Sequence, residues 1–505
     1  MTTDSRAAAP LTTGRFPSQV RFILGNEAAE RYSFYGVKGI LALYITNTLL
    51  MSEDAATNII HLFTFVNYFM PLLGAWVSDR HWGRYRTILW VSLSYCAGHG
   101  MLACGDAFAS IPGKTWCLGI GLGLIAFGSG GIKPCVSAFM GDQFPPEGRH
   151  LLPRAYAAFY WCVNLGSTAA LLSIPWIRKH HGYGWAFGVP GIAMALATLI
   201  FWLGTRHYVM VPPSARTRTA GFFSVFRHAF RERRSRAAGT GFWDPARTRF
   251  ADAEVDAARS VGPILSIFAL IPVFWALFDQ TFSTWVLQGA SMRPCPLGPL
   301  TLPTPDGLLA WLKGTAGSPL SEVSYTIGPE EMLAANPILV MILVPVMTFV
   351  VYPLAGRLAT PLRRMATGMF IAATSYLIVA WIQVQLEAGR ELSVLWQAIP
   401  YVVLTTAEVL ISTTGLEFAF REAAATMKSA IMGFWNVTVA LGNLIVIGVT
   451  WTAGRLSGQA AAGHDVAVTS KMFLFYAVLT FVVAILFSVI ASRYRYRDPE
   501  AALGR

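Results

Sequence analysis

Long apolar stretches separated by short polar loops run through almost the whole chain. About twelve of them approach or exceed the roughly 20 residues that an α-helix needs to cross a bilayer. The first six are expected at 22–50, 57–79, 86–105, 114–140, 153–177 and 184–205. The second six are expected at 262–290, 336–356, 365–387, 394–419, 429–455 and 471–492. The pattern therefore predicts an all-α membrane protein with 12 transmembrane helices.

The composition supports an integral membrane protein. The chain of 505 residues is 54% hydrophobic and only 13% charged, whereas soluble domains carry about 25% charged residues. The net charge of +12 comes largely from loops near 80–86, 149–154, 357–364 and 493–497. These loops lie on the side of the N-terminus, so the positive-inside rule predicts that both termini are cytoplasmic. The charge thus reflects orientation, and we expect no nucleic-acid partner.

Two details of the loops bear on location. Arg178 and Lys179 fall on the opposite, mostly acidic or neutral side, and the positive-inside pattern does not explain them. The short external loops favour a bacterial protein, a multi-pass protein of the inner (plasma) membrane. The six cysteines are scattered, without a CxxC or Cys/His cluster, so neither a disulfide framework nor a metal site is expected.

An arginine-rich stretch divides the two sets of spans. We expect a six-helix bundle at 1–205, a cytoplasmic linker at 206–260 and a second six-helix bundle at 261–505. Within the linker, four phenylalanines at near-helical spacing favour an amphipathic helix on the inner membrane surface, although a loop that merely retains arginines fits as well. They are Phe222, Phe223, Phe226 and Phe230. Two bundles joined by a linker are typical of a transporter with its site between the halves.

The stretch 25–40 carries charges inside the first span. At 100° per residue, one face of this helix collects six charged or aromatic side chains. They are Glu27, Glu30, Arg31, Phe34, Tyr35 and Lys38. A charge within a bilayer costs a few kcal/mol, so it must pair with another charge or face a water-filled cavity. The face is either a mutually satisfied structural cluster or part of a binding site.

Several motifs match known families. The loop GAWVSDRHWGRYR at 74–86 resembles the signature between spans 2 and 3 of the major facilitator superfamily. The motif Glu27-x-x-Glu30-Arg31-Tyr32-x-Phe34-Tyr35 resembles span 1 of the proton-coupled oligopeptide transporters, with Tyr32 and Phe34 exchanging the usual Phe and Tyr. Further matches follow in order at 127–144, 159–167, 275–280, 336–337 and 406–417. The resemblance implies two six-helix bundles. The chain departs from many bacterial members, which carry two extra central helices, because its linker has no apolar run long enough to span a bilayer.

The resemblance also implies a peptide site. The C-terminal carboxylate of a peptide would bind the cations Arg31, Lys38 and Lys133. The N-terminal ammonium would bind Asn164, Asn336 and Glu408. The side chains expected to line the site further are Tyr35, Tyr68, Ser412 and Trp435. Alternatively, the cations only neutralise nearby acids, and the two asparagines only join helices.

Four groups are candidates for proton coupling: Glu27, Glu30, Asp279 and His61. We expect charge pairs to close one face at a time, Lys38 with Asp279 on the outer side and Lys133 with Glu27 or Glu30 on the inner side. Protons would be the coupling ion, with no cofactor, and di- and tripeptides the cargo of a monomer in the lipid bilayer. Alternatives are another cargo on the same fold, such as nitrate, another anion or an amino-acid-like compound, or a non-transporting sensor. Enzyme motifs such as GxSxG, HExxH and the P-loop are missing, so no enzyme is expected.

Overall fold

The computed structural model describes residues 16–212, 221–232, 241–303, 305–315, 318, 320–356, 359–456 and 465–496. Within these ranges, eight helices are long and apolar enough to cross a membrane, or nine when the bent pair 252–268 and 271–290 counts as one span. Two of the eight cover two crossings each, because 53–107 and 152–207 are twice the usual length. The helix at the start of the chain adds a further crossing with too many charges to score as apolar. The described helices thus make the expected 12 crossings.

The first six crossings are built from five α-helices. They are α1 (Val20–Leu43), α2 (Glu53–Val77), α3 (Gly83–Cys104), α4 (Ile111–Asp142) and α5 (Leu152–Leu203). α5 contains two crossings, which meet at Gly182 with φ of 81°. This positive φ favours glycine, so the chain reverses there without a loop.

The second six crossings include several broken helices. Span 7 comprises α8 (Val261–Phe268), α9 (Ile271–Phe278), η8 (Asp279–Phe282) and α10 (Thr284–Ala290). Span 8 comprises η9 (Glu331–Ala334), α12 (Ala335–Val346), η10 (Met347–Val351) and α13 (Tyr352–Ala355). Span 10 comprises α15 (Ala398–Glu408), η13 (Val409–Thr413) and α16 (Thr414–Glu422). The remaining crossings are α14 (Pro361–Glu387), α17 (Lys428–Leu456) and α19 (Ser470–Arg493).

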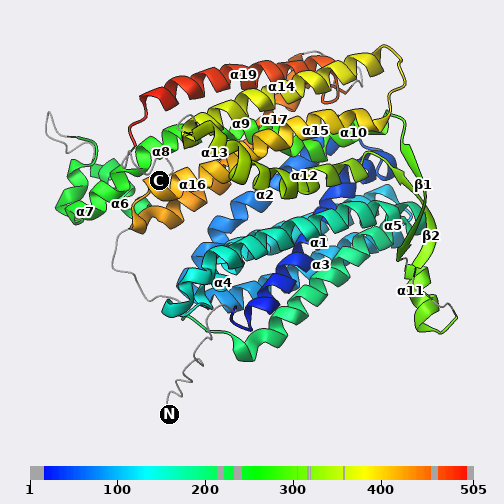
Figure 1. Cartoon of the computed structure of the whole chain (residues 1–505), viewed down its shortest axis with the longest axis horizontal. Helices are drawn as coiled ribbons and strands as arrows, with labels where there is room; N and C mark the ends of the chain where they lie inside the picture. The colour runs from blue at the N-terminus through cyan, green and yellow to red at the C-terminus, as the bar shows by residue number, and fades with distance from the viewer. Residues whose placement is uncertain are drawn as a thin grey trace.

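Two features outside the bundles mark the two membrane faces. The antiparallel strands β1 (Cys295–Pro303) and β2 (Leu320–Ile327) form a hairpin between the expected spans 262–290 and 336–356. The linker helices α6 (Phe222–Arg231) and α7 (Asp252–Arg259) lie at the opposite end (Figure 1). We call these faces the hairpin side and the linker side.

The linker forms the predicted helix rather than a plain loop. α6 buries Phe222, Val225 and Ala229. The ring of Phe222 packs at 5.4 Å against Phe434 of α17, so α6 docks on the second half of the protein. Phe223, Phe226 and Phe230 remain exposed.

The two halves have separate hydrophobic cores that meet on the hairpin side. One core consists of described residues between 222 and 487. The other consists of residues between 20 and 208, together with five side chains of the second half. These five are Phe282, Val286, Leu287, Leu333 and Ala334. The halves are therefore packed together on the hairpin side.

The structure explains the bases that did not fit the charge pattern. Arg178 and Lys179 end the first crossing of α5 on the hairpin side, where they pair with Glu330 and Glu331 of the second half. Their charges are balanced across the interface of the two halves, so the positive-inside rule need not account for them.

Candidate functional site

The charged face of α1 forms a compact buried cluster. The Nε atom of Arg31 lies 3.1 Å from Oε1 of Glu27, and its guanidinium also pairs with Glu30. Ser129 of α4 donates to the other oxygen of Glu30 at 3.3 Å. Arg31, Glu27 and Glu30 are 8%, 6% and 0% exposed. Two carboxylates share one arginine. With both carboxylates ionised, the cluster of Glu27, Glu30 and Arg31 carries a net charge of −1.

Lys133 of α4 lies beside this cluster but bonds elsewhere. Its Nζ atom donates to Oδ1 of Asn67 at 2.5 Å. It also lies over the rings of Phe34 and Tyr68, 4.5 and 4.3 Å from their centroids. The expected pair of Lys133 with Glu27 or Glu30 is not formed, because Arg31 takes both carboxylates. The lysine is held by a neutral amide and two aromatic faces, which leaves it able to bind an anion.

Glu408 stands in the other half, at the end of α15. Asn336 of α12 donates to Oε2 of Glu408 at 2.7 Å and to the hydroxyl of Thr405 at 3.2 Å. The π-helical turn η13 begins immediately after Glu408, and such turns are frequent at functional sites. No cation contacts this carboxylate among the described residues.

Arg31 and Lys133 form a positive pole in the first half, and Glu408 forms a negative pole in the second half. Two tyrosines are affected by the charges of both poles. The hydroxyls of Tyr35 and Tyr68 lie within electrostatic reach of both Arg31 and Glu408. Both tyrosines are only half-buried, as are the side chains of Lys133, Asn336, Glu408 and Ser412. The poles thus face a common region between the halves rather than lipid.

The remaining predicted lining residues differ in their surroundings. The amide of Asn164 donates to the backbone of Tyr160 on its own helix, 2.9 Å away. The hydroxyl of Ser412 is buried without a hydrogen-bond partner among the described residues. Trp435 is 6% exposed and packs against Phe268 and Trp275. Asn164 and Trp435 are therefore engaged within the protein, whereas Ser412 has a free hydroxyl.

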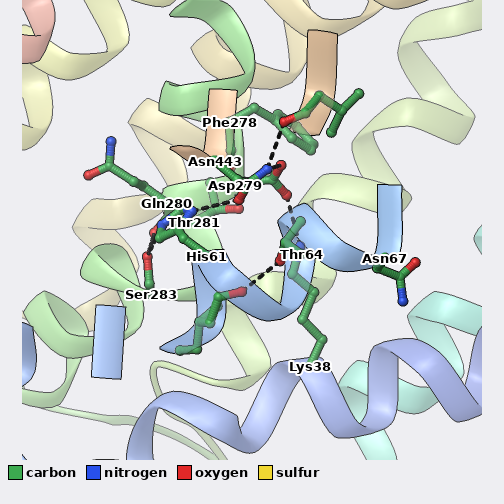
Figure 2. A network of polar contacts seen from close by, with 12 residues as sticks. Lys38, His61, Thr64, Asn67, Phe278, Asp279, Gln280, Thr281, Ser283 and Asn443 are labelled. Carbon is green, nitrogen blue, oxygen red and sulfur yellow. Dashed lines mark hydrogen bonds and ion pairs between the residues drawn. The ribbon is translucent and has the colours of Figure 1, made fainter. Parts of the chain in front are cut away.

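A second network lies nearer the hairpin side and joins both halves (Figure 2). Lys38 of α1 donates to Oδ1 of Asp279 at 2.8 Å, as expected from the sequence. Asn443 of α17 donates to the other oxygen of Asp279, also at 2.8 Å. The Oδ1 atom of Asn443 then accepts from His61 Nδ1 at 2.6 Å. The Nε2 atom of His61 is hydrogen-bonded to the hydroxyl of Ser283 at 2.9 Å. In this state Lys38 is bound to Asp279 and has no contact with the Arg31 cluster.

Sequence reasoning missed several members of these networks. Asn443 joins Asp279 to His61, Ser283 is the second partner of His61, and Asn67 is the partner of Lys133. Asn443 and Asn67 are fully buried. Each is an isolated amide in an apolar span, and that signal would have marked both as candidates.

The arrangement of 12 crossings in two halves, with charged groups between them, is that of the major facilitator superfamily fold. The model of the POT family matches residues 85–305 and 320–461. The chain belongs to this family, and the resemblance of its motifs is confirmed.

Relatives and solved structures agree with this assignment. Peptide transporter family 1 of Drosophila melanogaster is 34% identical over 398 residues, covering 76% of this chain and 49% of that protein. Solute carrier family 15 member 2 of Homo sapiens is 32% identical over 388 residues, covering 74% and 50%. The chain therefore spans about half the length of the curated relatives it matches.

The crystal structure of an auto-inhibited POT family peptide transporter is 37% identical, with a TM-score of 0.82 over 96% of this chain and 98% of that one. A second POT family transporter, crystallised in meso, is 36% identical with the same TM-score, over 96% and 100%.

Proposed function

We propose that this protein is a proton-coupled symporter that imports di- and tripeptides by alternating access. The observation that carries the proposal is the presence of the cations Arg31 and Lys133 in one half and of the carboxylate of Glu408 in the other. The charges of Arg31 and Glu408 both act on Tyr35 and Tyr68. A zwitterionic peptide has the complementary charges at its two ends. The names of the curated relatives, which are peptide transporters or members of solute carrier family 15, support this cargo.

In the proposed complex, the peptide carboxylate binds Lys133 and Arg31. Lys133 can exchange its bond to the neutral amide of Asn67 for an ion pair with the peptide carboxylate. Lys38 joins this site only when its pair with Asp279 breaks. The peptide ammonium binds Glu408 and Asn336. Asn164 supplies a further carbonyl oxygen, because only its Nδ2 atom is bonded to its own helix. Ser412, with its free hydroxyl, and Trp435 complete the lining.

The proposed proton sites are carboxylates whose ionised form is stabilised by a cation that can move away during transport. Peptide binding that draws Arg31 away from Glu27 and Glu30 would leave these acids buried without a cation, which favours their protonation. On the hairpin side, protonation of Asp279 would release Lys38 and loosen the contact between the halves. His61 supports Asp279 through Asn443.

The proposed orientation follows the basic loops. The linker side faces the cytoplasm and the hairpin side faces outward, in a bacterial inner membrane. The structure then corresponds to a state closed on its outer side. We propose that the protein acts as a monomer. Its two halves, residues 1–205 and 261–505, would rock against each other, joined by the linker 206–260.

Uptake of labelled dialanine into proteoliposomes tests the function. We expect accumulation when the outside is acidic and only slow equilibration without a pH gradient. N-acetyl-dialanine, which lacks the ammonium, should compete weakly, and nitrate should not compete. Competition by nitrate without dialanine uptake would contradict the proposal and favour an anion carrier. Binding of dialanine without uptake would favour a sensor.

A further inference from the structure

A pair of neighbouring bases meets a pair of neighbouring acids between the halves on the hairpin side. The Nε and Nη2 atoms of Arg178 both donate to Oε2 of Glu330, at 2.9 and 2.7 Å. Lys179 donates to Oε1 of Glu331 at 2.5 Å. We call these four residues the outer latch. None of their hydrogen bonds or ion pairs described above involves Lys38, Asp279 or a residue of the proposed peptide site.

The two acids of the outer latch are far more buried than the two bases. Glu330 and Glu331 are 1% and 3% exposed, whereas the side chains of Arg178 and Lys179 are 19% and 32% exposed. The acids are therefore enclosed where the halves meet, and the bases reach them from the surface. Separation of the halves on this side would return both carboxylates to water.

Glu330 is the less well satisfied of the two acids. Both oxygens of Glu331 are bonded, one to Lys179 and the other to the backbone N–H of Gly328 at 2.9 Å. Oε1 of Glu330 is buried and has no hydrogen-bond partner among the described residues. A buried carboxylate with an unpartnered oxygen favours its neutral form.

Few charged or titratable groups face Glu330 in the part of the chain that the structure describes. They are Arg178, Lys179 and Tyr183 of α5 and Glu331 of η9. Burial raises the pKa of Glu330 to about 7, and the attraction of Arg178 offsets only part of this effect. Glu330 lies one residue before span 8, so water can reach it once the hairpin side opens.

We propose that Glu330 makes closure of the hairpin side proton-linked: it takes up a proton when the halves close there and releases it when they separate. This inference rests on the alternating access of the proposed function. A hydrated glutamate has a pKa of about 4.3, so the closed state binds the proton more tightly. Closure is then favoured most at or below that pH, and the advantage is lost as the pH rises to about 7. Through Glu330, an acidic exterior thus favours the closed state and opposes the loosening that we propose for protonation of Asp279.

Distances between spin labels on the two halves test this linkage. Labels at Asn47→Cys and Ala388→Cys occupy exposed positions at the hairpin-side ends of spans 1 and 9, in a variant without the six native cysteines. We expect the ratio of short to long distances to be at least about tenfold higher at pH 5 than at pH 8. In Glu330→Gln, whose side chain is always neutral, this ratio should no longer rise at acidic pH.

Glu391→Gln is the matched control. Glu391 pairs with Arg293 on the same side of the membrane but within one half, and its side chain is 64% exposed. This variant should keep the pH response of the unsubstituted protein. The proposal is overturned if the ratio of short to long distances still rises at acidic pH in Glu330→Gln, or if it does not rise in the unsubstituted protein.

Uptake of dialanine by the same preparations separates the two proposals. Uptake without any pH-dependent distance change would contradict the role of Glu330 in proton-linked closure but agree with the proposed peptide transport. The expected distance change without uptake would support proton-linked closure through Glu330 but contradict the proposed peptide transport.

Discussion

Lys38 and Asp279 form an ion pair of 2.8 Å between side chains 241 positions apart in the sequence. The lysine is 3% exposed and the aspartate 4%. The pair joins α1 of the first half to span 7 of the second half, and Asn443 fixes the other oxygen of the carboxylate. One buried ion pair therefore connects the two halves directly.

Replacement of Asp279 by asparagine should uncouple uptake from the proton gradient. Asp279→Asn leaves Lys38 buried without a carboxylate, and breaking a buried pair from one side typically costs about 3–5 kcal/mol. We expect acid-driven accumulation of dialanine to fall to the level seen without a gradient. Comparison of gradient-driven uptake with counterflow, which needs no gradient, measures this loss.

The double variant Lys38→Gln/Asp279→Asn controls for simple instability. Removing both charges of a buried pair is often nearly neutral for stability. The double variant should regain most of the thermal stability that the single variant loses, yet remain uncoupled. Acid-driven accumulation in either variant would exclude Asp279 as the coupling site.

Asn443 should matter nearly as much for stability as the charged residues that it joins. Asn443→Leu removes the bonds to Asp279 and His61 and leaves both groups buried, at a cost of about 1–3 kcal/mol for each unsatisfied group. Thermal unfolding in detergent measures the effect. Thr452→Val on the same helix is the control, because this exposed hydroxyl bonds only to the backbone of Gly448. Equal unfolding temperatures for the two variants would contradict the role of Asn443.

The close approach of α1 and α5 depends on Gly166. A Cβ atom at this position would lie 2.3 Å from the backbone oxygen of Ala28 and 3.3 Å from Cβ of Arg31. Gly166→Ala should therefore displace α1 and cost about 1–3 kcal/mol in stability. Gly119→Ala on α4 meets nothing within 4 Å, so it should be neutral or stabilising by up to about 1 kcal/mol. Thermal unfolding of the two variants tests the difference, and a Gly166→Ala protein as stable as Gly119→Ala would contradict it.

Much of the fold could be predicted from the sequence because the bilayer imposes a length and a polarity on each span. The periodicity of 25–40 also placed Glu27, Glu30 and Arg31 on one face, where they do meet. The hairpin of β1 and β2 was not predicted, because prolines and glycine interrupt the alternation that marks a strand.

The partners of single residues were harder to predict. Lys133 bonds to Asn67 rather than to Glu27 or Glu30, and that choice depends on the relative rotation of α2, α4 and α1. Arg178 and Lys179 contradicted the charge pattern until the structure placed Glu330 and Glu331 opposite them. Spacing along one helix does not determine which residues of another helix face it.

Transport by the Glu408→Gln variant tests the central claim most directly. The claim is that Glu408 binds the ammonium of a peptide whose carboxylate binds Arg31 and Lys133. Loss of a charge-assisted bond of about 1.5–3 kcal/mol should lower dialanine uptake by about 10- to 100-fold. Uptake of N-acetyl-dialanine, which has no ammonium, should stay at its already low level. Dialanine uptake by Glu408→Gln at the unsubstituted rate would contradict the two-pole site.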